Sequence, residues 1–131
     1  MGDRWSSAWG FTLAALLLGA AGLLKGYKSA CHWAWRDMLS DFGAIAVAER
    51  VVRDRNRISG GGVTAGIDFG LHLCAELAGE TVARSIQLGL EYNPAPPYDC
   101  GHPDNADPAM VAMIRQRLAA REAELIQRAP R

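Results

Sequence analysis

Apolar side chains fill the stretch 12–24, which reads TLAALLLGAAGLL and contains no charged residue. It is shorter than the run of about 20 apolar residues that spans a bilayer as a helix. One interpretation is a signal peptide, with Arg4 as its basic region and the small residues of 19–22 near a cleavage point. The other is a helix that is apolar on all sides because neighbouring elements cover it. Asp3 cancels the charge of Arg4, so the pattern favours the covered helix, extending to about residue 25.

The stretch 27–58 predicts short strands and one helix. YKSACH at 27–32 is typical of a short strand, and residues 33–42 place apolar side chains at helical spacing before Gly43, the expected stop. A hairpin follows. Its strands hold Val51-Val52 and Ile58, and its turn is the polar Asp54-Arg55-Asn56.

Two amphipathic helices are predicted next, at 63–79 and 80–91. The first has the most regular periodicity of the chain, and Gly79 separates it from the second. We expect the apolar stripe of the first helix to be buried. The stripe consists of Val63, Ile67, Gly70, Leu71, Cys74, Leu77 and Ala78, and the second helix aligns Val82, Ala83, Ile86 and Leu90.

A Pro-rich loop at 93–108 precedes the last helix. We expect Asp107 to cap this helix and Pro108 to occupy its first turn, with the helix running to about Gln127. Its narrow apolar stripe suits a helix laid on a surface or on a partner. The stripe consists of Val111, Ile114, Leu118 and Leu125, with Met110 and Met113 beside it.

Composition excludes several classes of protein. The chain has 131 residues, the size of one domain, and its 14 basic and 14 acidic side chains give a net charge of zero. This balance argues against binding of nucleic acid through its phosphates. The three cysteines form no CxxC pair, which argues against a disulfide framework and against a zinc site. We therefore expect no metal and no cofactor.

A glycine loop at the start of the 63–79 helix is the first candidate site. Exposed N–H groups of Gly61, Gly62, Val63 and Thr64 at a helix N-terminus could hold an anion or line a substrate pocket. The chain has neither a Walker lysine nor a G-x-G-x-x-G pattern there. The simpler interpretation is that the glycines allow a tight turn and a close approach to another segment, and we favour it.

Two groups of titratable side chains are further candidates. Asp68, His72 and Glu76 share one helix face, which could orient a general base but is more often a solvated flank. His32 follows a predicted strand, and strand ends are where α/β proteins build their sites, although a lone histidine is more often structural.

None of the cysteines lies on a strand–turn–helix elbow, the geometry that activates a nucleophile. Cys74 is expected in the core and Cys100 in an exposed loop. Cys31 adjoins His32, which makes it the best of three weak candidates.

Four blocks of the chain together resemble the ThiJ/PfpI superfamily, and within it the isonitrile hydratases. They are LGAAGLLKGY, HWAWRDML, ERVVRDRNRISGGGVTAGIDFGL and QLGLEYNPAPPYD, which fall in the family's order and span about residues 15–99. The resemblance implies a partial, helix-rich version of an α/β three-layer sandwich of the flavodoxin-like, class I glutamine amidotransferase-like type. Proteins of this family are usually homodimers.

The resemblance also implies where the catalytic residues belong. The family's nucleophile is a cysteine at an elbow followed by Thr-Gly, and these positions fall on Thr12 and on Leu13-Ala14. His32 falls where related members place a histidine near the cysteine. The family's N-terminal half, with its acidic residue, has no counterpart in this sequence. We therefore expect a short unrelated leader at 1–14, the C-terminal part of a ThiJ/PfpI domain at 15–103, and a surface helix at 104–131.

The reaction implied by the resemblance is the hydration of an isonitrile, a small-molecule substrate, to an N-substituted formamide. We expect this chain to be truncated and catalytically impaired, because Thr12 replaces the cysteine. One alternative is a non-catalytic module that dimerises or pairs with a full-length relative. Another is a ligand-sensing amidase-like domain of the AraC-regulator type. We expect a cytoplasmic protein that binds neither nucleic acid nor membrane.

Overall fold

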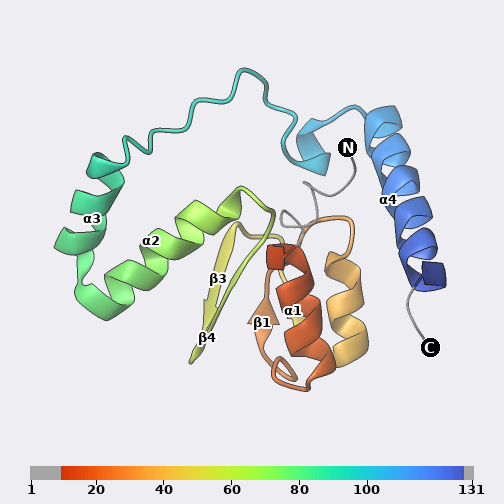
Figure 1. Ribbon diagram of the computed structural model, residues 1–131, viewed down its shortest axis with the longest axis horizontal. Helices are drawn as coiled ribbons and strands as arrows, with labels where there is room; N and C mark the ends of the chain where they lie inside the picture. The colour runs from red at the N-terminus through yellow and green to blue at the C-terminus, as the bar shows by residue number, and fades with distance from the viewer. Residues whose placement is uncertain (1–9, 129–131) are drawn as a thin grey trace. The chain divides into compact units, whose positions relative to one another are not determined.

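The computed structural model describes residues 10–128, with side chains described from Ala14 to Arg121. The chain divides into two compact units, one ending at Asn93 and the other beginning at Pro94 (Figure 1). The elements of the first unit are α1 (Gly10–Ala20), β1 (Lys28–Ser29), η2 (Arg36–Phe42), β2 (Ile45–Ala46), β3 (Val51–Asp54), β4 (Arg57–Gly60), α2 (Ala65–Ala78) and α3 (Glu80–Gly89). The second unit holds η3 (Pro103–Asn105) and α4 (Pro108–Arg128).

Helix α1 ends at Ala20, five residues before the predicted end at 25. Gly22 adopts a left-handed backbone with φ of 75°. Its N–H donates to the carbonyl of Gly19 at 2.8 Å, and the N–H of Leu23 donates to the carbonyl of Leu18 at 2.9 Å. This pair of bonds is a Schellman motif, which closes a helix wherever glycine can take the left-handed conformation. The apolar run therefore continues past the helix into a turn.

A parallel pair of short strands forms the centre of the first unit. β1 pairs with β2 through Lys28↔Ile45 and Ser29↔Ala46. The predicted strand at 27–32 is therefore reduced to two residues, and its partner β2 was not predicted. A strand of two residues is too short to show an alternating pattern of apolar and polar side chains. Its pairing is set by contacts between residues that are distant in sequence, which the local pattern does not reveal.

The segment between the parallel strands is a 3-10 helix, not the helix predicted over 33–42. The ring Nδ1 of His32 accepts a hydrogen bond from the N–H of Ala34 at 3.3 Å, which holds 33–35 as a turn. Gly43 ends η2 as predicted, with φ of 72° and its N–H directed to the carbonyls of Leu39 and Ser40.

The predicted hairpin is confirmed as the antiparallel pair of β3 and β4, joined by Arg55-Asn56. It is attached to β1 through side chains: the N–H of Lys28 donates to the Asp54 carboxylate at 2.8 Å, and the N–H of Ala30 donates to the Ser59 hydroxyl at 2.9 Å. The guanidinium of Arg55 lies 3.6 Å from the centre of the Tyr27 ring. Hydrogen bonds and a cation–π contact thus join the two small sheets.

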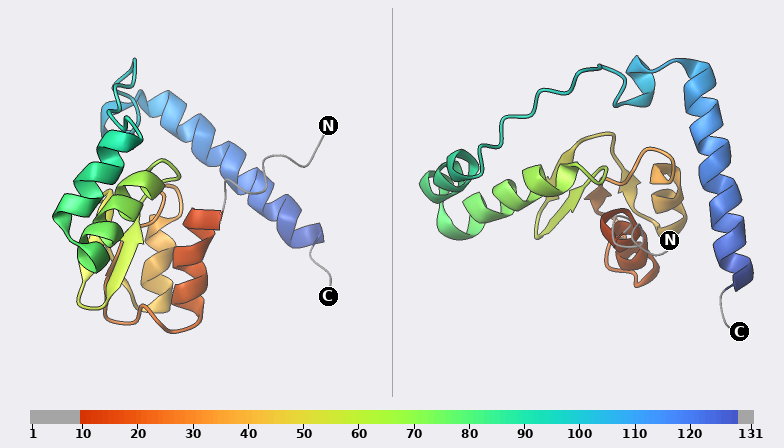
Figure 2. Two further views of the ribbon diagram at one scale, coloured as in Figure 1. Left: turned by 60° about the vertical axis from the view of Figure 1, so that its left-hand side comes forward. Right: turned by 45° about the horizontal axis from the view of Figure 1, so that its top comes forward.

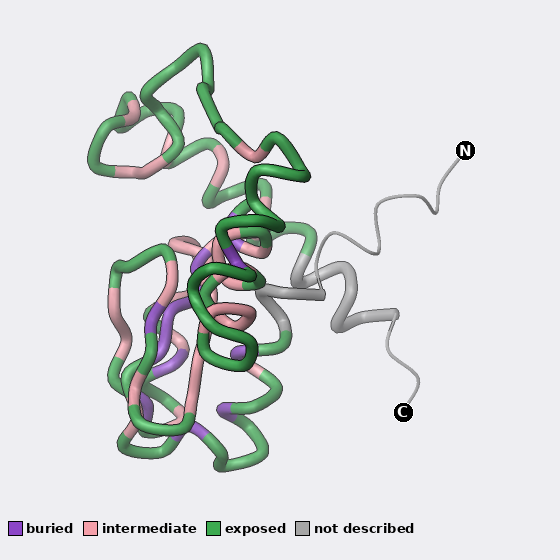
Figure 3. The backbone as a smooth tube through the Cα atoms, turned by 90° about the vertical axis from the view of Figure 1, so that its left-hand side faces the viewer, coloured by how far each residue is buried: buried purple, intermediate pink, exposed green. Residues whose placement is uncertain are grey.

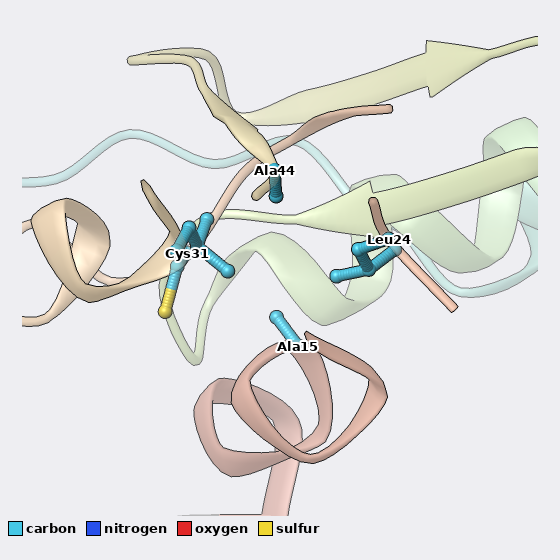
Figure 4. Packing of buried hydrophobic residues seen from close by; sticks show 5 residues of the cluster. Ala15, Leu24, Cys31 and Ala44 are labelled. Carbon is cyan, nitrogen blue, oxygen red and sulfur yellow. The ribbon is translucent and has the colours of Figure 1, made fainter. Parts of the chain in front are cut away.

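A small apolar cluster packs between α1, η2 and the parallel strands (Figure 4). Its members are Ala15, Leu24, Cys31, Leu39 and Ala44. Because three of these side chains are small, the cluster removes little apolar surface from water.

Helices α2 and α3 follow the hairpin, and α1 lies beside η2 (Figure 2). Gly79 separates α2 from α3 as predicted, and the predicted bounds of both helices agree with the structure within two residues. The expected burial of the α2 stripe is wrong: Ile67 is 48% exposed and Leu77 is 80% exposed. The buried contacts come instead from Ala65 in α2 and Ala83 in α3, and most of α3 is exposed (Figure 3).

In the second unit, the predicted start of α4 is confirmed. The Asp107 carboxylate accepts a hydrogen bond from the N–H of Ala109 at 2.7 Å, and Pro108 is the first helical residue. Val111 and Ile114 are half-buried, whereas the Leu125 side chain lies outside the described part of the chain. No helix within residues 10–128 is long and apolar enough to cross a membrane.

Candidate functional site

His32 lies in the loop after β1, close to two tryptophans. Its ring centre is 5.3 Å from that of Trp33 and 5.1 Å from that of Trp35. Burial lowers the pKa of His32 below its ordinary value, so the ring is neutral at neutral pH. Because Nδ1 accepts the Ala34 N–H, the proton of the neutral ring is on Nε2. The site thus holds a neutral imidazole with one N–H, close to two aromatic rings.

The glycine loop lies against this histidine. A methyl group at Gly62 would come within 4.0 Å of the His32 ring carbon Cδ2. Gly61 is buried, and its N–H donates to the carbonyl of Arg50 at 2.8 Å. A methyl group at Gly61 would lie only 3.1 Å from the carbonyl oxygen of Glu49. The glycines therefore permit the close approach that we favoured from the sequence, and this approach places the loop beside His32.

The other two loop candidates are exposed at the start of α2. Val63 and Thr64 both face solvent, and Thr64 makes no side-chain capping bond to the helix. The Arg50 guanidinium donates to the Thr64 carbonyl at 2.9 Å and to its hydroxyl at 3.4 Å. Arg50 therefore occupies the acceptors of Thr64 and ties the loop to the segment before β3.

Arg50 also pairs with Asp68, and the Tyr92 hydroxyl donates to the same carboxylate at 3.1 Å. Sequence reasoning missed Arg50 and Tyr92. Both lie in blocks that carry the family resemblance, but they are 18 and 24 residues from Asp68, so no local spacing could have linked them to it. This arginine–aspartate–tyrosine set fixes α2 against the strands and against the end of α3.

The helix face of Asp68, His72 and Glu76 does not form a catalytic pair. The His72 Nδ1–H lies 2.9 Å from the backbone carbonyl of Asp68, while the Asp68 carboxylate is taken by its arginine and tyrosine partners. Glu76 pairs with Arg53 at 2.9 Å. These contacts agree with the expectation that this helix face is a solvated flank. Across residues 10–128 no three His, Cys, Asp or Glu side chains gather as a metal site requires.

The cysteines have a different order of burial from the one we expected. Cys31 is 3% exposed and belongs to the core, whereas Cys74, expected in the core, is only half-buried and Cys100 is exposed. Burial raises the pKa of the Cys31 thiol, and its backbone hydrogen bond with His32 opposes this shift. A protonated, buried thiol is a poor nucleophile, so the geometry does not support Cys31 in that role.

Thr12 and Leu13 lie within the first turns of α1. Their side chains are outside the described part, so their assignment to the nucleophile elbow stays a prediction.

Residues 11–76 match the family model of the DJ-1/PfpI family. The chain belongs to the DJ-1/PfpI family. It is 55% identical over 105 residues to an isonitrile hydratase from Pseudomonas putida, covering 80% of this chain and 46% of that protein. The matched segment holds both halves of the candidate site, because it contains His32 and the whole glycine loop.

Solved DJ-1/PfpI structures confirm the fold. A ThiJ/PfpI family protein from Pseudomonas syringae superposes with a TM-score of 0.77 and 52% identity, covering 81% of this chain and 44% of the other. A DJ-1 superfamily protein from Salmonella typhimurium gives a TM-score of 0.54 at 36% identity, covering 64% of this chain and 44% of the other. The fold is therefore a partial, helix-rich α/β fold of the DJ-1/PfpI type. The chain spans less than half the length of these relatives.

Proposed function

We propose that this chain provides the C-terminal part of an isonitrile hydratase-type site and that it does not hydrate isonitriles by itself. The similarity to an isonitrile hydratase extends over 80% of the chain. It includes His32 and the Gly61-Gly62 loop, which pack together. These residues form one wall of a small-molecule pocket in this proposal.

The proposal rests mainly on the burial of Cys31, which keeps its thiol protonated. Hydration through a thiol begins with attack of a thiolate on the terminal isonitrile carbon, and protonation of that carbon gives a thioimidate. Water then adds to the thioimidate and releases the formamide, so that R–NC and water give R–NH–CHO and free thiol. Cys31 is buried and its pKa is raised, which keeps it protonated, and in this proposal Thr12 stands at the elbow position. A threonine hydroxyl does not ionise without a dedicated base.

His32 has a part that does not require a thiol in this chain. Its Nε2–H can donate a hydrogen bond to a substrate or intermediate, while the bond from Ala34 to Nδ1 fixes the tautomer. The rings of Trp33 and Trp35 both lie near the imidazole. We assign His32 to positioning and proton donation in the complete site.

An assay with a simple aryl isonitrile tests the proposal, with formamide measured by chromatography. The full chain is expected to give no formamide above the buffer rate, because removing a covalent nucleophile lowers rates by several orders of magnitude. Cys31→Ala is the matched variant. Turnover by the chain that disappears in Cys31→Ala would show that the buried thiol is the nucleophile and would overturn the proposal.

A non-catalytic interaction module is the second candidate. It is favoured by the exposed apolar side chains of α2, where Ile67 is 48% exposed and Leu77 is 80% exposed. Apolar surface of this kind is typical of binding sites for other polypeptides. The two candidates are compatible if the partner is the part that completes the domain.

A further inference from the structure

From Ala14 onward, the side of α1 that faces away from the core is apolar. Ala14, Leu17, Leu18 and Ala21 follow helical spacing and are all exposed, with Leu17 at 67% and Leu18 at 40%. We call these four residues the outer α1 face. The opposite side of α1, through Ala15, joins the core. A helix that is apolar all round is covered on every side in a complete domain.

The parallel sheet of β1 and β2 is also covered on one side only. Ala44 belongs to the apolar cluster with α1, and Ala46 packs against it. Alternation along the strand directs Ile45, between them, to the other side, where it is 51% exposed. Parallel sheets in α/β proteins have both faces covered. The exposed Ile45 therefore marks a second uncovered surface, on the far side of the sheet from α1.

These two surfaces limit what can cover them. A two-fold contact with a second copy uses one patch of each chain, and so would leave the surface on the other side of the sheet exposed. The relatives suggest a different occupant. This chain covers 44% of the Pseudomonas syringae structure and 46% of the Pseudomonas putida isonitrile hydratase, so each has more than half a chain without a counterpart here.

We propose that the outer α1 face and Ile45 dock a second polypeptide that carries the N-terminal part of a DJ-1/PfpI domain. The partner supplies parallel strands and helices, so it covers the sheet and α1 on both sides at once. The inference rests on the proposed function, since it treats this chain as the C-terminal part of that domain.

Co-expression tests the proposal directly. The full tagged chain is produced together with the N-terminal part of the Pseudomonas putida isonitrile hydratase, ending just after the elbow cysteine that the resemblance assigns to the family. The expected result is co-purification as a one-to-one complex by light scattering, with slower hydrogen exchange in peptides containing Leu17 and Ile45. If co-expression yields too little of the partner, the two polypeptides are purified separately in urea and refolded together by dilution. Recovery of the same complex supports the proposal, and separate precipitation contradicts it.

Matched variants identify the surface. Leu17→Glu and Ile45→Glu each place a charge in the contact and are expected to weaken association by about tenfold or more. Leu88→Glu on α3 is the control, because Leu88 is at least as exposed and belongs to neither surface. Leu88→Glu is expected to leave the affinity unchanged. Equal weakening by all three variants would overturn the assignment of the surface.

Two further results would also overturn it. One is the absence of a complex under both conditions. The other is a homodimer of the chain that Leu17→Glu dissociates, because a second copy would then cover α1. Association is measured without turnover. Isonitrile hydration by the isolated chain would therefore refute the proposed function while the docking result stands separately.

Discussion

Replacement of Gly19 by alanine tests the packing of α1 on η2. In an open helix interior, Gly→Ala stabilises by about 0.8–1 kcal/mol. Here the added methyl group would lie 2.8 Å from Cδ2 of Phe42 and 3.1 Å from its Cβ and Cγ. The contact includes the base of the phenylalanine side chain, so ring rotation alone cannot relieve it. Overpacking of this kind costs about 1–3 kcal/mol, so after the gain in helix propensity a net destabilisation of up to about 2 kcal/mol is expected.

Gly70→Ala in α2 is the control, because a methyl group there meets no heavy atom within 4 Å. It is expected to stabilise by about 0.5–1 kcal/mol. Hydrogen exchange of the α1 amides measures the effect, and a loss of about 2 kcal/mol lowers protection by about 30-fold. The packing argument would be refuted if Gly19→Ala raised protection of α1 as Gly70→Ala raises that of α2.

Three other predictions concern the thiols, His32 and Tyr92. Maleimide should label Cys100 fastest and Cys31 slowest, because Cys31 is buried and its pKa is raised, and mass spectrometry of partial labelling checks the order. Because burial lowers the pKa of His32, the unfolded chain binds more protons, so stability should be complete above pH about 6.5 and fall as pH decreases below it. His32→Gln should flatten that decline in urea titrations, and an unchanged slope would contradict it. Tyr92→Phe should destabilise by about 0.5–1.5 kcal/mol through the lost hydrogen bond to Asp68, and a neutral result would mean that the bond adds no stability.

Local signals in the sequence predicted the elements that depend on local physics. Gly43 and Gly79 end their helical segments as expected, since both take positive φ values. The hairpin turn and the Asp107 cap follow from short-range hydrogen bonding in the same way. The end of α1 was missed because the apolar run continues through Gly22, where backbone conformation and not hydrophobicity ends the helix.

Non-local contacts account for the other errors. Nothing near Ile45 indicates that it pairs with Lys28, and nothing near Arg50 indicates that it reaches Asp68. The burial of α2 was overestimated because periodicity shows which face of a helix is apolar and not whether anything covers it. Of the candidate site, the structure brings the glycine loop beside His32, a contact that the sequence did not predict, whereas the elbow at Thr12 stays a prediction.

The most direct test of the account compares isonitrile hydration by the isolated chain and by its complex with the N-terminal part of the Pseudomonas putida isonitrile hydratase. The resemblance assigns an elbow cysteine to the family, and the partner is chosen to end just after its own. We expect formamide formation by the co-purified pair, none above background by either polypeptide alone, and loss of the activity when Leu17→Glu disrupts the complex. Hydration by the isolated chain at the rate of the pair would contradict it.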